Sequence, residues 1–218
     1  MTVVFFDLDG TLTDAGPGIL NCVSYALEKM HLPPFEGNGS WMIGPPLWPT
    51  FEKLGVKKEN LDHAVALYRE RYTDVGWSEN SLYEGVLEQL SVLKDLDYTL
   101  CIATSKPYSY AQKITSHFGI SNYMAHEFGS ELDGVRSDKT SLLAHGLGVT
   151  GALAESSLMV GDRSYDVIGA KNNGMKVVGA IYGYGGNTEL IEAGADALIS
   201  DVIELSSAVT SFLPLKDT

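Results

Sequence analysis

The stretch VVFFDLDGT at residues 3–11 constrains the fold of this chain more than any other. Its first four residues, two β-branched and two aromatic, predict a short strand buried on both faces, as in a parallel sheet covered by helices. The strand runs directly into two carboxylates and a glycine, which lets the backbone turn sharply. Ligands of open α/β sheets bind beyond the carboxyl ends of strands. We therefore expect Asp7 and Asp9 to lie in a binding site.

Two carboxylates this close repel each other, so the site must supply a cation or keep one of them protonated. Mg²⁺ prefers oxygen ligands and often takes one or two carboxylates together with a substrate phosphate. A carboxyl group with a raised pKa can act as general acid and then as general base. If Asp7 is the nucleophile, the intermediate is an aspartyl phosphate. An ordinary acidic turn after a strand is the alternative at this point.

The composition indicates a globular protein and excludes some partners. The chain has 218 residues, 44% of them hydrophobic and 20% charged, and a formal net charge of -13. This charge argues against binding to nucleic acid or to anionic membranes. We see no apolar segment of spanning length and no secretory signal, so we expect a cytoplasmic protein. Cys22 and Cys101 are interpreted as buried small hydrophobes, without a disulfide or a metal.

The first third of the chain after the opening motif has a helical pattern and no strand signal. Ile19, Val23 and Leu27 recur at helical spacing, and all three tryptophans fall in the same segment. The flanking stretches 16–18 and 78–81 are interpreted as flexible hinges. We therefore expect an inserted helical cap domain at residues 16–83, with the core domain formed by residues 1–15 and 84–218.

From Gly85 onward, expected helices alternate with short apolar strands. Such alternation predicts right-handed βαβ units and a Rossmann-like, doubly wound parallel sheet. The expected strands after the first are residues 99–103, 127–129, 158–160, 176–181 and 197–199. The expected helices are residues 86–93, 108–118, 139–147, a segment ending at 173, 189–192 and 205–212.

Further polar residues follow these strands or begin helices. Thr104 offers a hydroxyl, and the backbone N–H groups of Ser105 and Lys106 are expected at a helix N-terminus, where phosphate binds readily. Lys139 is a candidate to neutralise phosphate, and the pair Asp162 and Asp166 is a candidate for metal binding. Alone, each has an ordinary alternative as a helix cap or a solvated surface side chain. Their joint occurrence favours a site.

In this order and spacing, the pattern resembles the phosphatase branch of the haloacid dehalogenase superfamily. The matching pieces are DLDGT at residues 7–11, Thr104 after a strand, Lys139, and the GDRSYD motif at residues 161–166. The resemblance spans nearly the whole chain, because the helical insert is similar to the C1 cap of that superfamily. No catalytic residue departs from the pattern.

Shorter motifs resemble the phosphoglycolate-phosphatase-like members, some of which are described as 5′-nucleotidases. They are IGPPL at residues 43–47, ATSKP at 103–107, GDR at 161–163 and YGYG at 182–185. The resemblance implies that Asp7 is the nucleophile and Asp9 the general acid and base. It also implies Mg²⁺ held by Asp7, the Asp9 carbonyl and Asp162, with Asp166 in support.

The phosphate of a small phosphorylated metabolite would bind residues of the same motifs. Thr104 and Lys139 are implied to grip it, and Gly10, Thr11 and Ser105 are further candidates. Within the cap, Trp41 is expected to cover the substrate; burial of Trp41 in the cap's own core is the alternative.

The leading hypothesis is a Mg²⁺-dependent phosphatase that acts on a small phosphomonoester, phosphoglycolate-like or a nucleoside 5′-monophosphate. One alternative is a phosphomutase of the same fold. A haloacid dehalogenase is disfavoured, because Asp9 suits protonation of a leaving alkoxide, which a halide does not need. An alternative of another class is a non-catalytic regulatory protein that binds a phosphorylated ligand.

Overall fold

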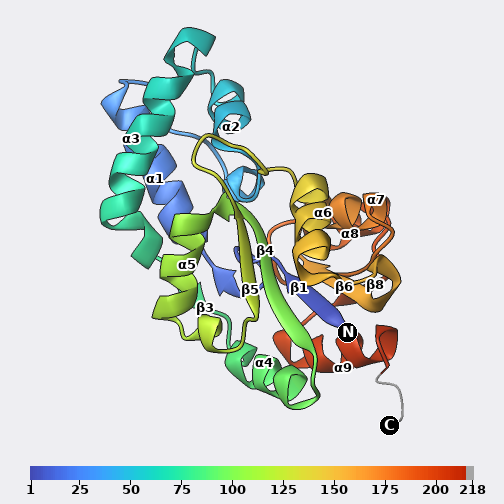
Figure 1. Cartoon of the computed structure of the whole chain (residues 1–218). Coiled ribbons are helices and arrows are strands. Elements are labelled where there is room, and N and C mark those ends of the chain that lie inside the picture. The colour runs from blue at the N-terminus through green and yellow to red at the C-terminus, as the bar shows by residue number, and fades with distance from the viewer. Residues whose placement is uncertain (215–218) are drawn as a thin grey trace.

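The computed structural model describes residues 1–214, which form a parallel sheet with helices on both faces (Figure 1). Six strands pair in the order β5-β4-β1-β6-β7-β8, and every pairing is parallel. The prediction of a doubly wound α/β sheet is therefore confirmed. The strands of this sheet are β1 (Val3–Phe6), β4 (Thr99–Pro107), β5 (His126–Ser130), β6 (Ser157–Gly161), β7 (Lys176–Ala180) and β8 (Ala197–Ile199).

Strand β1 lies at the centre of the sheet and is covered on both faces. Val3 and Phe5 pack into one hydrophobic cluster, and Val4 and Phe6 pack into another. All four side chains are fully buried, because successive strand residues point to opposite faces and helices cover each face. One face carries α4 (Val86–Asp95), α5 (Tyr108–His117) and α9 (Leu205–Phe212), and the other α6 (Lys139–Thr150), α7 (Ser164–Asn172) and α8 (Gly186–Ala193).

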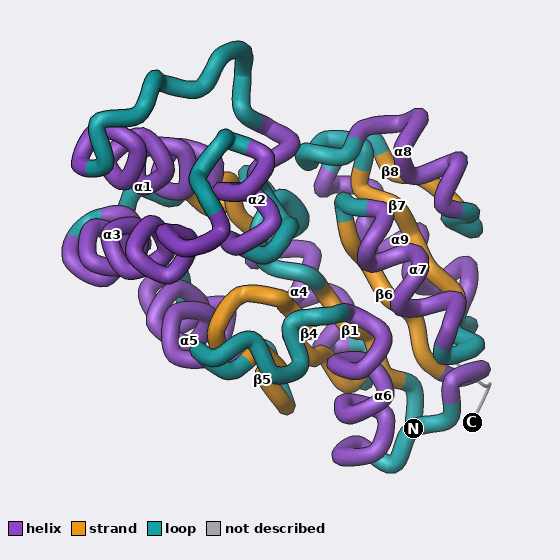
Figure 2. The backbone as a smooth tube through the Cα atoms, turned by 90° about the horizontal axis from the view of Figure 1, so that it is seen from above, coloured by secondary structure: helices purple, strands orange, loops and turns teal. Residues whose placement is uncertain are grey.

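Three further helices lie between β1 and α4 in the sequence and group together beside the sheet (Figures 1 and 2). They are α1 (Gly16–Lys29), α2 (Leu47–Lys53) and α3 (Leu61–Asp74). They enclose a hydrophobic cluster separate from the two clusters of the sheet, with Val23, Phe51 and Val65 buried in it. The assignment of residues 16–83 to a separate cap domain stays a prediction that this packing supports.

Single 3-10 turns connect several of these elements. They are η1 (Ser40–Met42), η2 (Lys58–Asn60), η3 (Gly76–Ser78), η4 (Ile120–Asn122), η5 (Ala154–Ser156) and η6 (Val202–Glu204).

Two short strands where the chain enters and leaves the helical segment were not expected. Strands β2 (Thr13–Asp14) and β3 (Ser81–Leu82) pair antiparallel. The expectation of a flexible turn at residues 16–18 is wrong, because α1 already begins at Gly16. Pro17 occupies the first turn of α1, where its fixed φ suits a helix and its missing N–H costs nothing.

The sequence placed most other elements correctly, although several differ in length; helix α6, for example, runs to Thr150 instead of ending near residue 147. Strand β4 continues to Pro107 instead of ending near Ala103, and the extra residues pair with β5 after an irregularity in register. Helix α8 begins at Gly186 instead of Glu189. The free thiols of Cys22 and Cys101 are buried, as expected. In residues 1–214, no helix combines the length and the apolar character that crossing a bilayer requires.

Candidate active site

The opening motif places two carboxylates at the carboxyl end of β1. The backbone N–H of Asp7 donates to Val160 O at 2.9 Å, which extends the pairing of β1 with β6 by one residue. Leu8 points into the core, and its carbonyl accepts from the N–H groups of Leu12 and Thr13, both at 3.0 Å. Because side chains alternate along this short extended segment, Asp7 and Asp9 both face away from the core that holds Leu8.

Lys139 is a buried cation at the first position of α6. Its Nζ lies 2.8 Å from Asp7 Oδ1 and 2.6 Å from Asp166 Oδ1, and donates to Ala103 O at 2.6 Å. The Asp138 side chain caps α6 by accepting a hydrogen bond from Ser141 N. This cap fixes where the helix begins and therefore where Lys139 lies. Burial alone would lower the pKa of Lys139, but the charges of Asp166 and Asp7 outweigh it and raise this pKa. The group is therefore an ammonium that ties two carboxylates together.

Asp162 follows β6 and is held by the backbone and by a hydroxyl. Thr11 Oγ1 donates to Asp162 Oδ1 at 3.2 Å, and Tyr184 N donates to Asp162 Oδ2 at 2.8 Å. Burial raises the pKa of Asp162 well above its ordinary value, and the charges of Asp7 and Asp166 raise it further. A cation at this position would restore the ionised form.

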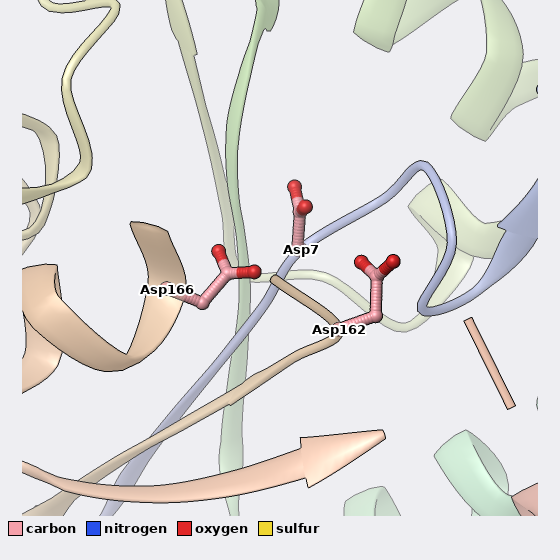
Figure 3. Close-up of side chains that lie close together, drawn as sticks. All are labelled: Asp7, Asp162 and Asp166. Carbon is pink, nitrogen blue, oxygen red and sulfur yellow. The ribbon is translucent and has the colours of Figure 1, made fainter. Parts of the chain in front are cut away.

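Asp166 lies in the first turn of α7, with both oxygens engaged. Arg163 N donates to Asp166 Oδ2 at 3.0 Å, and Oδ1 contacts Lys139. Burial raises the pKa of Asp166 to about 6, although Lys139 opposes the shift. Figure 3 shows the carboxyl groups of Asp7, Asp162 and Asp166 side by side; Asp7 comes from the segment after β1, and the other two from the segment after β6.

Glycines let the backbone approach these carboxylates closely. Gly10 has φ +89°, and a Cβ atom there would lie 2.2 Å from Asp162 Oδ2. A Cβ atom at Gly161 would lie 2.3 Å from Asp166 Cγ. A larger residue at either position would displace a carboxylate, so the site requires glycine at both positions.

The acidic cluster fits a divalent cation. Carboxylate oxygens of Asp7, Asp162 and Asp166 all lie within 4.8 Å of one another, and all three residues are buried. Together with Asp9, the site contains four carboxylates. Within residues 1–214, their ion pairs are with two ammonium groups only, those of Lys106 and Lys139. A donor set made of oxygens with excess negative charge is what a hard cation such as Mg²⁺ prefers.

Asp9 differs from the cluster in its partner. Its Oδ2 lies 2.7 Å from Lys106 Nζ, while Oδ1 is buried and accepts no hydrogen bond within residues 1–214. Burial raises the pKa of Asp9, Lys106 opposes this, and the charge of Asp7 adds to the rise. A raised pKa suits a group that must deliver a proton.

Thr104 and Ser105 lie on β4 beside the carboxylates, but the local structure differs from the expectation. Thr104 is 2% exposed and accepts a hydrogen bond from Lys106 N at 3.3 Å. Helix α5 begins at Tyr108, as predicted, but Ser105 and Lys106 belong to β4 and do not form the N-terminus of that helix. The position of the Lys106 side chain beside Asp9 was not predicted from the sequence. Its spacing of two from Thr104, which puts both on one side of a strand, was the available signal.

A cavity of about 250 Å³ opens in front of the catalytic candidates. Its lining includes Asp7, Asp9, Thr104, Ser105, Lys106 and Lys139, together with Trp48, Tyr68, Arg69 and Tyr72 of the helical segment. Gly10 and Thr11 are not part of that lining and instead contact Asp162 from behind.

The expectation that Trp41 covers the substrate is not met by this geometry. Trp41 packs against the core of the helical segment, with Lys53 Nζ 3.9 Å from its ring centroid. The tryptophan that lines the cavity is Trp48. Both lie in the same irregular region, and only three-dimensional packing decides which of them faces the cavity.

Known proteins share this arrangement. A family model described as haloacid dehalogenase-like hydrolase matches residues 4–180. The chain is 40% identical to the 5′-nucleotidase of Pseudomonas aeruginosa over 86% of each protein. It is 39% identical to the tyrosine-protein kinase PtkA of Mycobacterium tuberculosis, over 84% of this chain and 63% of that protein. The crystal structure of a predicted phosphatase from Clostridium acetobutylicum has a TM-score of 0.91 and 37% identity, covering 96% of this chain and 98% of that one.

The doubly wound sheet with an acidic cluster at its strand ends defines an α/β protein with a candidate metal site. The chain belongs to the haloacid dehalogenase-like hydrolase family. The predicted enzyme class, a phosphatase of this family, is confirmed.

Proposed function

We propose that the protein is a Mg²⁺-dependent phosphatase that hydrolyses a small phosphomonoester through an aspartyl phosphate on Asp7. The observation that carries this proposal is the position of Asp7. Its carboxylate lines the cavity and contacts the Lys139 ammonium at 2.8 Å, within a cluster of buried carboxylates. This arrangement supports a nucleophile whose charge is balanced and which faces the space where a substrate binds.

In the first half of the reaction, a carboxylate oxygen of Asp7 forms a bond to phosphorus while the bond to the leaving oxygen breaks. Asp9 gives its proton to that leaving oxygen. Thr104, on β4, offers its hydroxyl to the phosphoryl oxygens, and Lys139 stabilises their charge.

In the second half, a water molecule attacks the phosphorus of the aspartyl phosphate. Asp9, now ionised, takes a proton from this water, so that the products are inorganic phosphate and regenerated Asp7. The same residue thus acts first as acid and then as base. The raised pKa that burial gives Asp9 supports the acid role, and its contact with Lys106 supports the return to the ionised form.

Mg²⁺ would be held by Asp7 and Asp162, with the Asp9 carbonyl as a further ligand. When bound, the ion neutralises charge on the phosphoryl group and orients it. Asp166 would support this set from outside, because both of its oxygens are already engaged, one by Lys139 and one by Arg163 N.

The substrate is proposed to be a small phosphorylated metabolite, phosphoglycolate-like or a nucleoside 5′-monophosphate. The relative named 5′-nucleotidase supports the second choice. Residues 16–83, proposed as the cap, supply Trp48, Tyr68 and Tyr72 to the cavity wall, and these rings would meet the leaving group.

Release of inorganic phosphate from a panel of phosphoglycolate, nucleoside monophosphates and sugar phosphates, with Mg²⁺ and with EDTA, tests the proposal. Asp7→Asn is expected to abolish turnover, because an amide does not attack phosphorus. Substantial turnover by Asp7→Asn would remove Asp7 from the nucleophile role. Dependence on a sugar bisphosphate would indicate the phosphomutase, and binding of phosphate esters without turnover by wild type would indicate a regulatory protein.

A further inference from the structure

Lys106 is a buried lysine that joins two distant parts of the chain. Its side chain is only 7% exposed, and its Nζ lies 2.7 Å from Asp9 Oδ2. The same Nζ donates to the hydroxyl of Tyr72 at 2.6 Å. Tyr72 belongs to α3 of the helical segment, whereas Asp9 follows β1. The ammonium therefore forms a direct connection between the helices and the proposed general acid.

On the sheet side, the connection is held by β4, in the stretch after Ala103 where the pairing with β5 is irregular. Lys106 lies on β4, where its own N–H donates to Thr104 Oγ1 at 3.3 Å. Within residues 1–214, Lys106 is the one residue that forms an ion pair with Asp9. A buried carboxylate with a single charged partner takes its orientation from that partner.

The helical side of the connection is rigid. Tyr72 is 2% exposed, and its ring stacks on Tyr68 at 5.5 Å and meets Tyr110 edge-on at 5.0 Å. With its ring fixed in this way, the Tyr72 hydroxyl is placed by the position of α3. A displacement of α3 away from Lys106 would withdraw this hydroxyl.

We infer that Lys106 is a positioning residue that couples the placement of α3, through the Tyr72 hydroxyl, to the orientation of the general acid Asp9. The inference rests on the proposed role of Asp9. It means that protonation of the leaving group is efficient only while α3 holds the Tyr72 hydroxyl in contact with Lys106. Lys106 itself transfers no proton in this scheme; it holds the carboxyl group that does.

The test uses two esters of similar shape that differ in their need for an acid. p-Nitrophenolate leaves readily without a proton, whereas phenolate is the poorer leaving group. The measured quantity is kcat/KM of the full-length protein with Mg²⁺, because it covers the step in which the leaving group departs. Tyr72→Phe keeps the ring but removes the hydroxyl, and Lys106→Met removes the ammonium.

Tyr72→Phe should lower kcat/KM for phenyl phosphate by ~10-fold, about the worth of one hydrogen bond to a charged group. The loss with p-nitrophenyl phosphate should be much smaller. Lys106→Met should lose at least ~100-fold with phenyl phosphate, within the range of general acid catalysis. The double variant should lose no more than Lys106→Met, because Phe keeps the ring of Tyr72 and the hydroxyl acts through Lys106.

Tyr25→Phe is the matched control. It removes a hydroxyl from the same helical segment that donates to the Glu70 carboxylate at 2.6 Å, away from the cavity lining. The ratio of the two kcat/KM values should stay at the wild-type level in this variant.

The outcomes separate the inference from the proposed function. If wild type hydrolyses neither ester and none of the substrate panel, the proposed function fails. If wild type is active but Tyr72→Phe loses equally with both esters, or the losses multiply in the double variant, the coupling is refuted. Should Lys106→Met fail to fold, the ratio in Tyr72→Phe decides alone, and an unchanged ratio refutes the coupling.

Discussion

Replacing Lys139 by methionine would test the charge balance of the site. Methionine keeps an apolar stem but removes the ammonium that contacts Asp7, Asp166 and Ala103 O at 2.8, 2.6 and 2.6 Å. The Lys139 side chain is only 3% exposed, so water does not replace these contacts. Removing one partner of a buried ion pair costs about 3–5 kcal/mol. For a chain of this size, that corresponds to a fall in Tm of roughly 6–20 °C.

Thermal and urea unfolding near neutral pH would measure this loss, in EDTA and in Mg²⁺. Because the variant lacks a cation, Mg²⁺ should raise its Tm more than that of wild type. Lys171→Met is the control, since Lys171 is 38% exposed and its ion pair within residues 1–214 is with Asp196, at 2.6 Å; it should cost about 0–1 kcal/mol. A Lys139→Met variant as stable as the control in EDTA would refute the reasoning.

The remaining predictions concern backbone space and acid stability. Gly10→Ala should destabilise the fold by more than the ~1–2 kcal/mol that a left-handed non-glycine residue costs, and should weaken Mg²⁺ binding by displacing Asp162. Gly134 also has a positive φ, +91°, but a Cβ atom there would have no neighbour within 4 Å. In urea unfolding, Gly134→Ala should therefore show the cost of the backbone strain alone. Burial would raise the pKa of Asp196, but hydrogen bonds from Lys171 and neighbouring groups outweigh it and lower this pKa below 3.8. The carboxylate therefore contributes stability above pH 3.8 that is lost as pH falls through the folded value. Asp196→Asn should be less stable than wild type near neutral pH, and the difference should shrink in acid; a constant difference would contradict this.

The sequence predicted the sheet and the meeting of the carboxylates with Lys139 because both depend on local patterns and on one rule of topology. Apolar runs marked the strands, and parallel strands bring their carboxyl ends to one edge. Asp7, Lys139, Asp162 and Asp166 follow strands or begin helices, so their meeting could be expected without coordinates.

Other features depend on contacts that no single sequence displays. The role of Lys106 requires both the extension of β4 and the arrival of Tyr72 from α3. The choice of Trp48 over Trp41 at the cavity depends on how the region before α2 packs. The strand pair β2–β3 is too short to produce a periodic signal, and it forms because its two halves are brought together by the rest of the fold.

That short strand pair makes the helical segment, in topological terms, the loop of a β-hairpin. Asp14 lies opposite Ser81, so the two ends of the helical segment meet at one point beside the main sheet. The entropic cost of closing a loop grows only logarithmically with its length. The number of residues in the helical segment therefore has little effect on the free energy of folding the sheet. Insertions, deletions or substitutions between the two strands would therefore change the residues around a bound substrate, while Asp7, Asp9 and Asp162 would keep their positions.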